Sequence, residues 1–322
     1  MFYLAWTPLT LPSPPGGEGN RKAKIPMTRR VQKIKESLIE GLLCAAALCS
    51  VFITVGIVLV LASETSAFFN EVSIVDFLTD TQWTPLFHEK HFGILPLVAG
   101  TLLTTTIAMA VAAPAGLIVA IYLGEYASAR VRAVVKPMLE VLVAVPTVVY
   151  GYVALLWVTP LLARLIPGLS GFNALSPGIV MGIMILPIVS SLSEDALHAV
   201  PMGLREGGYA LGATRLQVAF RIAVPAALSG ILSALILGIS RAVGETMIVA
   251  IAAGLQPRLT FDPTVPIATA TAYILQVSMG DTPSGTLEYR TIFAVATALF
   301  IVTFVLNIVS HLLRRRFREV YT

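Results

Sequence analysis

Long apolar stretches alternate with short polar segments along this chain, and the alternation predicts its elements. Apolar residues dominate about six stretches, each long enough to cross a ~30 Å hydrocarbon layer as an α-helix. A helix satisfies its own backbone hydrogen bonds where no water is present, so helices are the expected elements. We therefore expect an all-α integral membrane protein with about six transmembrane helices. The stretches lie at 38–62, 94–122, 138–163, 175–193, 226–254 and 291–313.

The composition agrees with a membrane protein. Hydrophobic residues make up 56% of the chain and charged residues only 12%, whereas a soluble domain is about 25% charged. Both cysteines, Cys44 and Cys49, fall inside the first apolar stretch. They offer too few soft ligands for a metal site, so we expect no metal and interpret them as packing residues.

Lysine and arginine residues are unevenly distributed between the polar segments. Cytosolic segments of membrane proteins carry an excess of these residues, which orients the chain. With a cytosolic N-terminus, the outer segments hold only Lys90, Arg164, Arg258 and Arg290. The bias therefore predicts that both termini are cytosolic. Basic residues beside a membrane are expected for this reason alone, so the basic tail does not indicate a nucleic-acid partner.

Four regions follow from this pattern. Residues 1–26 are rich in proline and glycine, which predicts a disordered or mis-assigned extension, and we hypothesise that translation begins at Met27. Residues 27–93 form a basic cytosolic lead, the first transmembrane helix and an external loop. Residues 94–313 form the main transmembrane domain, and residues 314–322 form a basic cytosolic tail.

The external loop carries His88 and His91, whose spacing would place two metal ligands on one helix face. Pro85 and Gly93 argue against a long helix there, and no third ligand is evident. An interfacial loop with an aromatic anchor such as Trp83 is the simpler interpretation.

A short polar segment between the fourth and fifth stretches is punctuated by glycine. Residues 202–211 can form a helix that Gly212 stops, because glycine readily adopts the left-handed conformation of a helix end. Thr214 can cap a second helix, and Pro225 permits a sharp turn into the fifth stretch. The segment resembles the EAA loop of ABC importer permeases, although glycines replace the two usual alanines. The residues of this coupling loop are Glu206, Gly207, Gly208, Gly212, Arg215, Ile222 and Pro225.

The resemblance implies that the loop docks onto a separate ATPase, which would bind ATP and Mg. The chain contains no Gly-Lys pair and so lacks the phosphate-binding loop of P-loop ATPases. We therefore expect a non-catalytic subunit without a cofactor of its own. A plain amphipathic loop between two spans is the alternative.

Two opposite charges lie within the fifth stretch. A central arginine in a transmembrane helix costs about 2.5–3.5 kcal/mol, so such residues normally face a bundle interior or water. Arg241 and Glu245 are four residues apart and can pair on one helix face. Either the pair fixes helix packing, or Arg241 attracts a passing oxyanion while Glu245 orients it and prevents binding that is too tight. With Thr246, these residues form the predicted translocation site.

The charged residues extend the resemblance to the phosphate permeases of the PstC family. The resemblance covers about residues 40–316 and implies a type-1 importer bundle, inorganic phosphate as substrate and the bacterial inner membrane. The implied partners are the sister permease PstA, a dimer of the ATPase PstB, and the periplasmic or lipid-anchored phosphate-binding protein PstS. The motifs are Arg-Ala-Val-Gly-Glu-Thr-Met-Ile-Val at 241–249, Phe-Gly-Ile-Leu-Pro at 92–96, Pro-Thr-Val-Val-Tyr-Gly at 146–151 and Leu-Gly-Ala-Thr-Arg at 211–215.

Other classes stay open. A permease for molybdate or sulfate would share the coupling loop but need not share Arg241 with Glu245. A secondary transporter would show internal inverted repeats, and we find no convincing similarity between the two halves. A membrane enzyme would need an intramembrane cluster of His, Asp or Glu side chains, and only the single Arg–Glu pair is evident.

Overall fold

The computed structural model describes residues 27–316. The predicted extension at 1–26 lies outside the described residues, as do the last six residues of the basic tail, 317–322. The chain divides into two compact units, residues 1–57 and 58–322. Helix α1 (Met27–Phe69) begins in the first unit, where the basic lead and the apolar stretch form one continuous helix.

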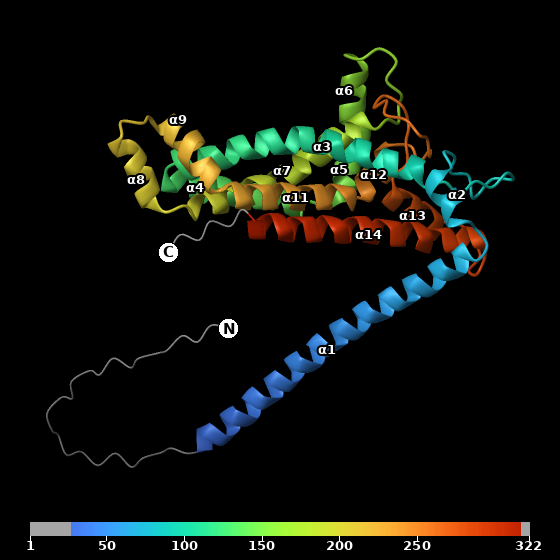
Figure 1. The fold of residues 1–322 in the computed structure, drawn as a ribbon, viewed down its shortest axis with the longest axis horizontal. Helices are drawn as coiled ribbons and strands as arrows, with labels where there is room; N and C mark the ends of the chain where they lie inside the picture. Colours follow the sequence, from blue (N-terminus) through green and yellow to red (C-terminus); the bar gives the residue numbers. More distant parts are fainter. Residues whose placement is uncertain (1–26, 317–322) are drawn as a thin grey trace. The chain divides into compact units, whose positions relative to one another are not determined.

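The second unit is a bundle of long helices, and its described part contains no β-strand. Helix α7 packs against α3 and α11, and α11 packs against α14, as the side-by-side course of these helices in Figure 1 shows. Close approach of α3 and α7 depends on Gly182, because a Cβ atom there would lie 2.7 Å from the carbonyl oxygen of Ala108. Small residues allow this kind of packing between membrane helices. The four helices are α3 (Leu95–Ile121), α7 (Leu175–His198), α11 (Leu228–Val243) and α14 (Leu287–Arg316).

The third predicted span is not one straight helix. Helix α4 ends at Ala144, Val145 is extended, and the helical segments that follow continue at 87° to it. Proline disfavours helical backbone at the residue before it, so Pro146 accounts for the break. Arg130, Arg132 and Lys136 belong to α4. The segments are α4 (Ala129–Ala144), α5 (Thr147–Val153), η2 (Ala154–Val158) and α6 (Thr159–Ala163), of which η2 is π-helical.

The fifth predicted span, 226–254, is also interrupted. Helix α11 ends at Val243, and a separate short helix, α12 (Met247–Ala252), follows after Gly244. The expectation of one continuous helix through this stretch was therefore wrong. The described residues contain four helices long and apolar enough to span a membrane, or up to six if each of two bent helix pairs counts as one span. This range includes the predicted number.

A cluster of aromatic residues lies around the end of α1. Figure 1 shows this end of the bundle opposite α8 (Met202–Ala210) and α9 (Arg215–Val218). Phe68, Phe77, Trp83 and Tyr273 pack there edge to face. They join the end of α1 to two further short helices, and so fix the loop that follows the first span. The short helices are α2 (Ile74–Thr79) and α13 (Ala270–Ser278).

The loop histidines do not form a metal site in the part of the chain that the structure describes. The ring Nδ1 of His91 lies 2.9 Å from Asp80 Oδ2 instead. Burial acts to raise the pKa of the Asp80 carboxyl, but hydrogen bonds from the N–H of Gln82 and from His91 lower that pKa below its usual value. The pair closes the loop on itself, and Trp83 is buried in the aromatic cluster instead of serving as an exposed interfacial anchor.

Candidate functional site

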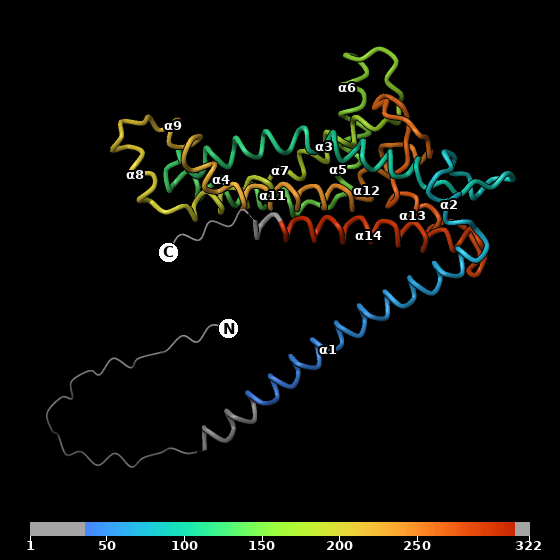
Figure 2. Tube along the Cα trace, viewed as in Figure 1, coloured from blue at the N-terminus to red at the C-terminus, as the bar shows by residue number. Residues whose placement is uncertain are grey.

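The coupling loop forms one end of the bundle. Figure 2 shows the chain leaving α7, forming α8 and α9, and returning as α11. Gly212 follows the end of α8 with φ of +82°, and Thr214 caps α9 in a capping box with Gln217. Both the helix stop and the cap predicted from the sequence are confirmed. The segments are α8 (Met202–Ala210), α9 (Arg215–Val218), the π-helical η3 (Ala219–Ala223) and α10 (Val224–Ala226).

The return of the chain into the bundle is sharp. The helical run Arg215–Ala226 meets α11 at 72°, and the bend falls at Ala227. Pro225 lies in α10, near the end of this helical run, rather than in the bend itself.

The two glycines of the loop have different surroundings. Gly207 is exposed, and a Cβ atom there would meet nothing within 4 Å. Gly208 is buried, and its Cβ atom would lie 2.4 Å from Ile222 Cδ1 and 3.2 Å from Val218 Cγ2. Gly208 therefore allows α8 to pack closely on the returning helix, which explains why Ile222 belongs to the same motif.

The loop presents an apolar surface that the sequence analysis missed. Leu211 is 90% exposed, and the large side chains of Met202, Leu216 and Phe220 are also exposed. Glu206 and Arg215, in the same loop, are also exposed. An apolar patch rimmed by polar residues is typical of a protein interaction site. The spacing of these residues could have revealed the patch only once the two short helices were placed.

The predicted charged pair lies at the break between α11 and α12. Arg241 Nη1 donates to Glu245 Oε2 at 2.6 Å, so the expected pairing is present. The Glu245 side chain is only 2% exposed, and its other oxygen accepts the N–H groups of Met247 and Ile248 at 3.2 and 3.4 Å. The carboxylate thus caps α12 while it neutralises the arginine. Thr246 lies half-buried in the same break.

The pairing with Glu245 does not occupy all the N–H donors of Arg241. Its side chain is 38% exposed, whereas that of Glu245 is buried. A guanidinium group carries five N–H donors, and its contacts within the described residues are with Glu245 and, at 3.8 Å, with the sulfur of Met184. The group therefore retains N–H donors that have no partner within the described residues.

The break has a further support that the sequence did not reveal. Thr271, in the first turn of α13, donates a hydrogen bond to the carbonyl oxygen of Glu245 at 2.7 Å. This oxygen is freed by the end of α11, and the bond satisfies it inside the bundle. No local pattern could have indicated a contact between residues so distant along the chain.

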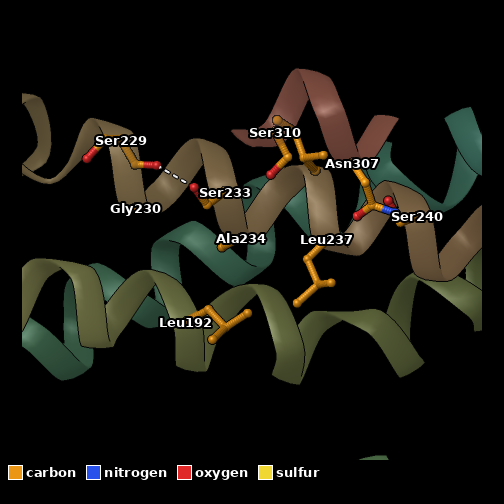
Figure 3. A pocket seen from close by; sticks show the side chains of 10 residues that line it. Leu192, Ser229, Gly230, Ser233, Ala234, Leu237, Ser240, Asn307 and Ser310 are labelled. Carbon is orange, nitrogen blue, oxygen red and sulfur yellow. Dashed lines mark hydrogen bonds between the residues drawn. The ribbon is translucent and has the colours of Figure 1, made fainter. Parts of the chain in front are cut away.

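A cavity of about 450 Å³ lies between α7, α11 and α14 (Figure 3). One of its lining residues, Ser240, directly precedes Arg241 in the sequence. Ser229, Ser233, Ser240, Asn307 and Ser310 supply its polar lining. The Ser233 hydroxyl donates to the Ser229 carbonyl oxygen at 2.8 Å, whereas the Ser240 hydroxyl is buried and has no partner within the described residues. Polar groups inside a membrane bundle normally serve packing or a pathway. In the sequence, this polar lining could have been recognised from the serines of α11, which follow one another at intervals of four and seven residues.

Comparison with known proteins decides the family. Residues 112–319 match the family described as "Binding-protein-dependent transport system inner membrane component". The chain belongs to this family of transport permeases. Such a permease is the membrane subunit of an ABC importer and is not itself catalytic; the family implies a separate ATPase and a substrate-binding protein.

Curated relatives agree with the resemblance found in the motifs, which is therefore confirmed. The permease is 34% identical over 276 residues to the probable ABC transporter permease protein YqgH of Bacillus subtilis, covering 85% of this chain and 88% of the relative. It is 32% identical over 262 residues to the phosphate transport system permease protein PstC of Xylella fastidiosa, covering 75% and 79%. The PstC protein of Haemophilus influenzae is 31% identical over 265 residues, with coverage of 76% and 82%.

Solved structures confirm the fold. A bacterial ABC transporter that imports the acidic polysaccharide alginate matches 90% of the permease and 100% of its own chain, with a TM-score of 0.62 and 17% identity. The MetNI methionine ABC transporter in an inward-facing conformation matches 70% and 95%, with a TM-score of 0.51 and 18% identity. The bundle is thus that of a type-1 ABC importer permease.

Proposed function

We propose that this permease moves inorganic phosphate through an ATP-driven importer of the bacterial inner membrane. The observation that carries the proposal is Arg241, a half-exposed guanidinium group held by the buried Glu245 at a break in a membrane helix. An arginine within a membrane bundle is costly, which favours a role in a pathway. The PstC relatives, identical at about a third of the aligned positions, support phosphate as the oxyanion.

The pairing of Arg241 with Glu245 suits the passage of an anion rather than its tight binding. A guanidinium group hydrogen-bonds phosphate oxygens in a fork and supplies the charge that an anion needs inside a membrane. Glu245 offsets that charge at 2.6 Å and so weakens the hold on the anion. Thr246 supplies a neutral hydroxyl at the same break. An anion can therefore be attracted by Arg241 and still leave.

The proposed partners follow from the family and the relatives. We assign the exposed loop at α8 and α9 to docking of a PstB-type ATPase dimer, which would supply ATP and Mg. The second half of the pore would come from a PstA-type permease, and phosphate would arrive on a PstS-type binding protein. In this orientation the coupling loop and both termini are cytosolic, and no nucleic acid takes part.

A tagged copy of the permease tests this function in cells. We expect the tag to co-purify a P-loop ATPase and a second permease, and deletion of the gene to abolish high-affinity phosphate uptake. Excess sulfate or molybdate should leave the uptake by wild-type cells unchanged. If sulfate or molybdate competed at concentrations similar to that of phosphate, the competing anion would take the place of phosphate as the proposed substrate.

The orientation of the chain gives a separate prediction. In a variant in which Cys44 and Cys49 are alanine, we expect Glu89→Cys to react with an impermeant thiol reagent applied to intact spheroplasts. Arg221→Cys, exposed in η3, should react only after the membrane is opened. The positive charges around the coupling loop are the physical reason, because they retain that end in the cytosol. The reverse labelling pattern would refute the orientation.

A further inference from the structure

Arg205 differs from the other side chains of α8 in pointing into the bundle. Its side chain is 8% exposed, although it lies within the coupling loop, where most side chains face outward. The partner of its charge is Glu125, whose side chain is 7% exposed. Arg205 Nη2 and Nε lie 2.8 and 3.2 Å from Glu125 Oε1. The two residues form a buried, bidentate ion pair across 80 positions of sequence.

The remaining donors of Arg205 hold the backbone. Nη2 donates to the carbonyl oxygen of Leu197 at 2.7 Å, and Nη1 donates to that of Val200 at 2.6 Å. Leu197 lies in the last turn of α7, and Val200 lies in the link to α8. The guanidinium group thus satisfies carbonyl oxygens at a helix end that have no further helix to bond to.

Glu125 belongs to η1 (Tyr122–Tyr126), the π-helical turn that continues α3 without interruption. Arg205 consequently connects α8 to the ends of both α3 and α7, the two most closely packed helices of the bundle. A neighbouring buried carboxylate, Glu194, pairs with Arg132 and Lys136 of α4 and does not involve α8. Within the described residues, Arg205 is the buried charge that joins the coupling loop to the bundle.

We propose that Arg205 is the positioning residue through which movement of α8 reaches α3 and α7. The inference rests on the proposed function, in which an ATPase docks on the loop and moves it. Because four hydrogen bonds from one planar group fix α8 in direction as well as in place, a displaced α8 pulls both helix ends with it. A single lysine ammonium group could neutralise Glu125 but could not hold the three oxygen sites in this fork geometry.

The test compares variants in proteoliposomes that contain the complete transport complex. We would measure the amount of ATPase bound per permease, the rate of ATP hydrolysis, and the phosphate imported per ATP hydrolysed. Arg205→Lys should assemble with normal amounts of ATPase but import about ten-fold less phosphate per ATP, which is typical of a lost coupling between two sites. Arg130→Lys, an exposed arginine of α4, is the matched control and should behave as wild type.

A double variant separates positioning from stability. Glu125→Met alone leaves the Arg205 charge buried and unpaired, so we expect less assembled complex. Adding Arg205→Met removes the unpaired charge and should restore assembly, but not the ratio of phosphate to ATP. A normal ratio in Arg205→Lys or in the assembled double variant would overturn the inference, as would failure of both to assemble. If the wild-type permease bound no ATPase, the proposed function itself would fall.

Discussion

Replacement of Arg241 by glutamine should lower phosphate uptake about 100-fold, since hydrogen bonds to a charged group contribute about 1.5–3 kcal/mol and about 1.4 kcal/mol is a factor of ten. The variant keeps most of the side-chain length and loses the charge that attracts the anion. Uptake is measured with radioactive phosphate and normalised to assembled complex in the membrane. Arg164→Gln, at an exposed arginine, is the control and should leave uptake unchanged.

The double variant Arg241→Gln with Glu245→Gln distinguishes a pathway from packing. If the pair only fixes helix packing, removing both charges avoids an uncompensated buried charge and should restore what either single change loses. If Arg241 attracts the anion, the double variant should fold and assemble yet remain deficient in uptake. Glutamine can still accept the N–H groups of Met247 and Ile248, so α12 should keep its cap. Recovery to near wild-type uptake would remove Arg241 from the pathway.

Gly208→Leu should release the ATPase from the membrane complex. The new side chain would start 2.4 Å from Ile222 Cδ1, inside the contact between α8 and η3. Overpacking of this kind costs about 1–3 kcal/mol, so we expect roughly a ten-fold or greater loss of bound ATPase. The measurement is the amount of ATPase co-purified with tagged permease.

Two matched variants serve as controls for this experiment. Gly207→Leu makes the same chemical change one residue earlier, where a Cβ atom has open space, and should leave the permease folded and inserted. Gly208→Ala adds only a methyl group beside the flexible end of Ile222 and should be tolerated, in agreement with the alanine usual in the family loop. Equal ATPase recovery from Gly208→Leu and wild type would contradict this packing account.

The features that depend on composition and local pattern could be predicted from the sequence. Apolar length predicted the membrane helices, and glycine and threonine chemistry predicted the end of α8 and the cap of α9. The pairing of Arg241 with Glu245 followed from their four-residue spacing on one helix. Each of these depends on neighbours within about one helical turn.

Features set by tertiary contacts were missed. Hydropathy does not register a helix break when apolar residues continue through it, so the break at Gly244 fell inside one predicted span, 226–254. The bonds from Thr271 to Glu245 and from Arg205 to Glu125 join distant segments. The sequence alone does not distinguish Arg205 from the other arginines of the chain. Its burial, not its sequence position, sets it apart.

Transport by the purified complex in proteoliposomes tests the central claim most directly. The permease would be reconstituted with its partner permease and ATPase, with ATP inside the vesicles on the loop side and phosphate-loaded binding protein on the other. We predict that radioactive phosphate accumulates only when ATP is hydrolysed, and that excess sulfate or molybdate does not reduce the accumulation. Phosphate movement without ATP, or preferential accumulation of sulfate or molybdate, would contradict the account.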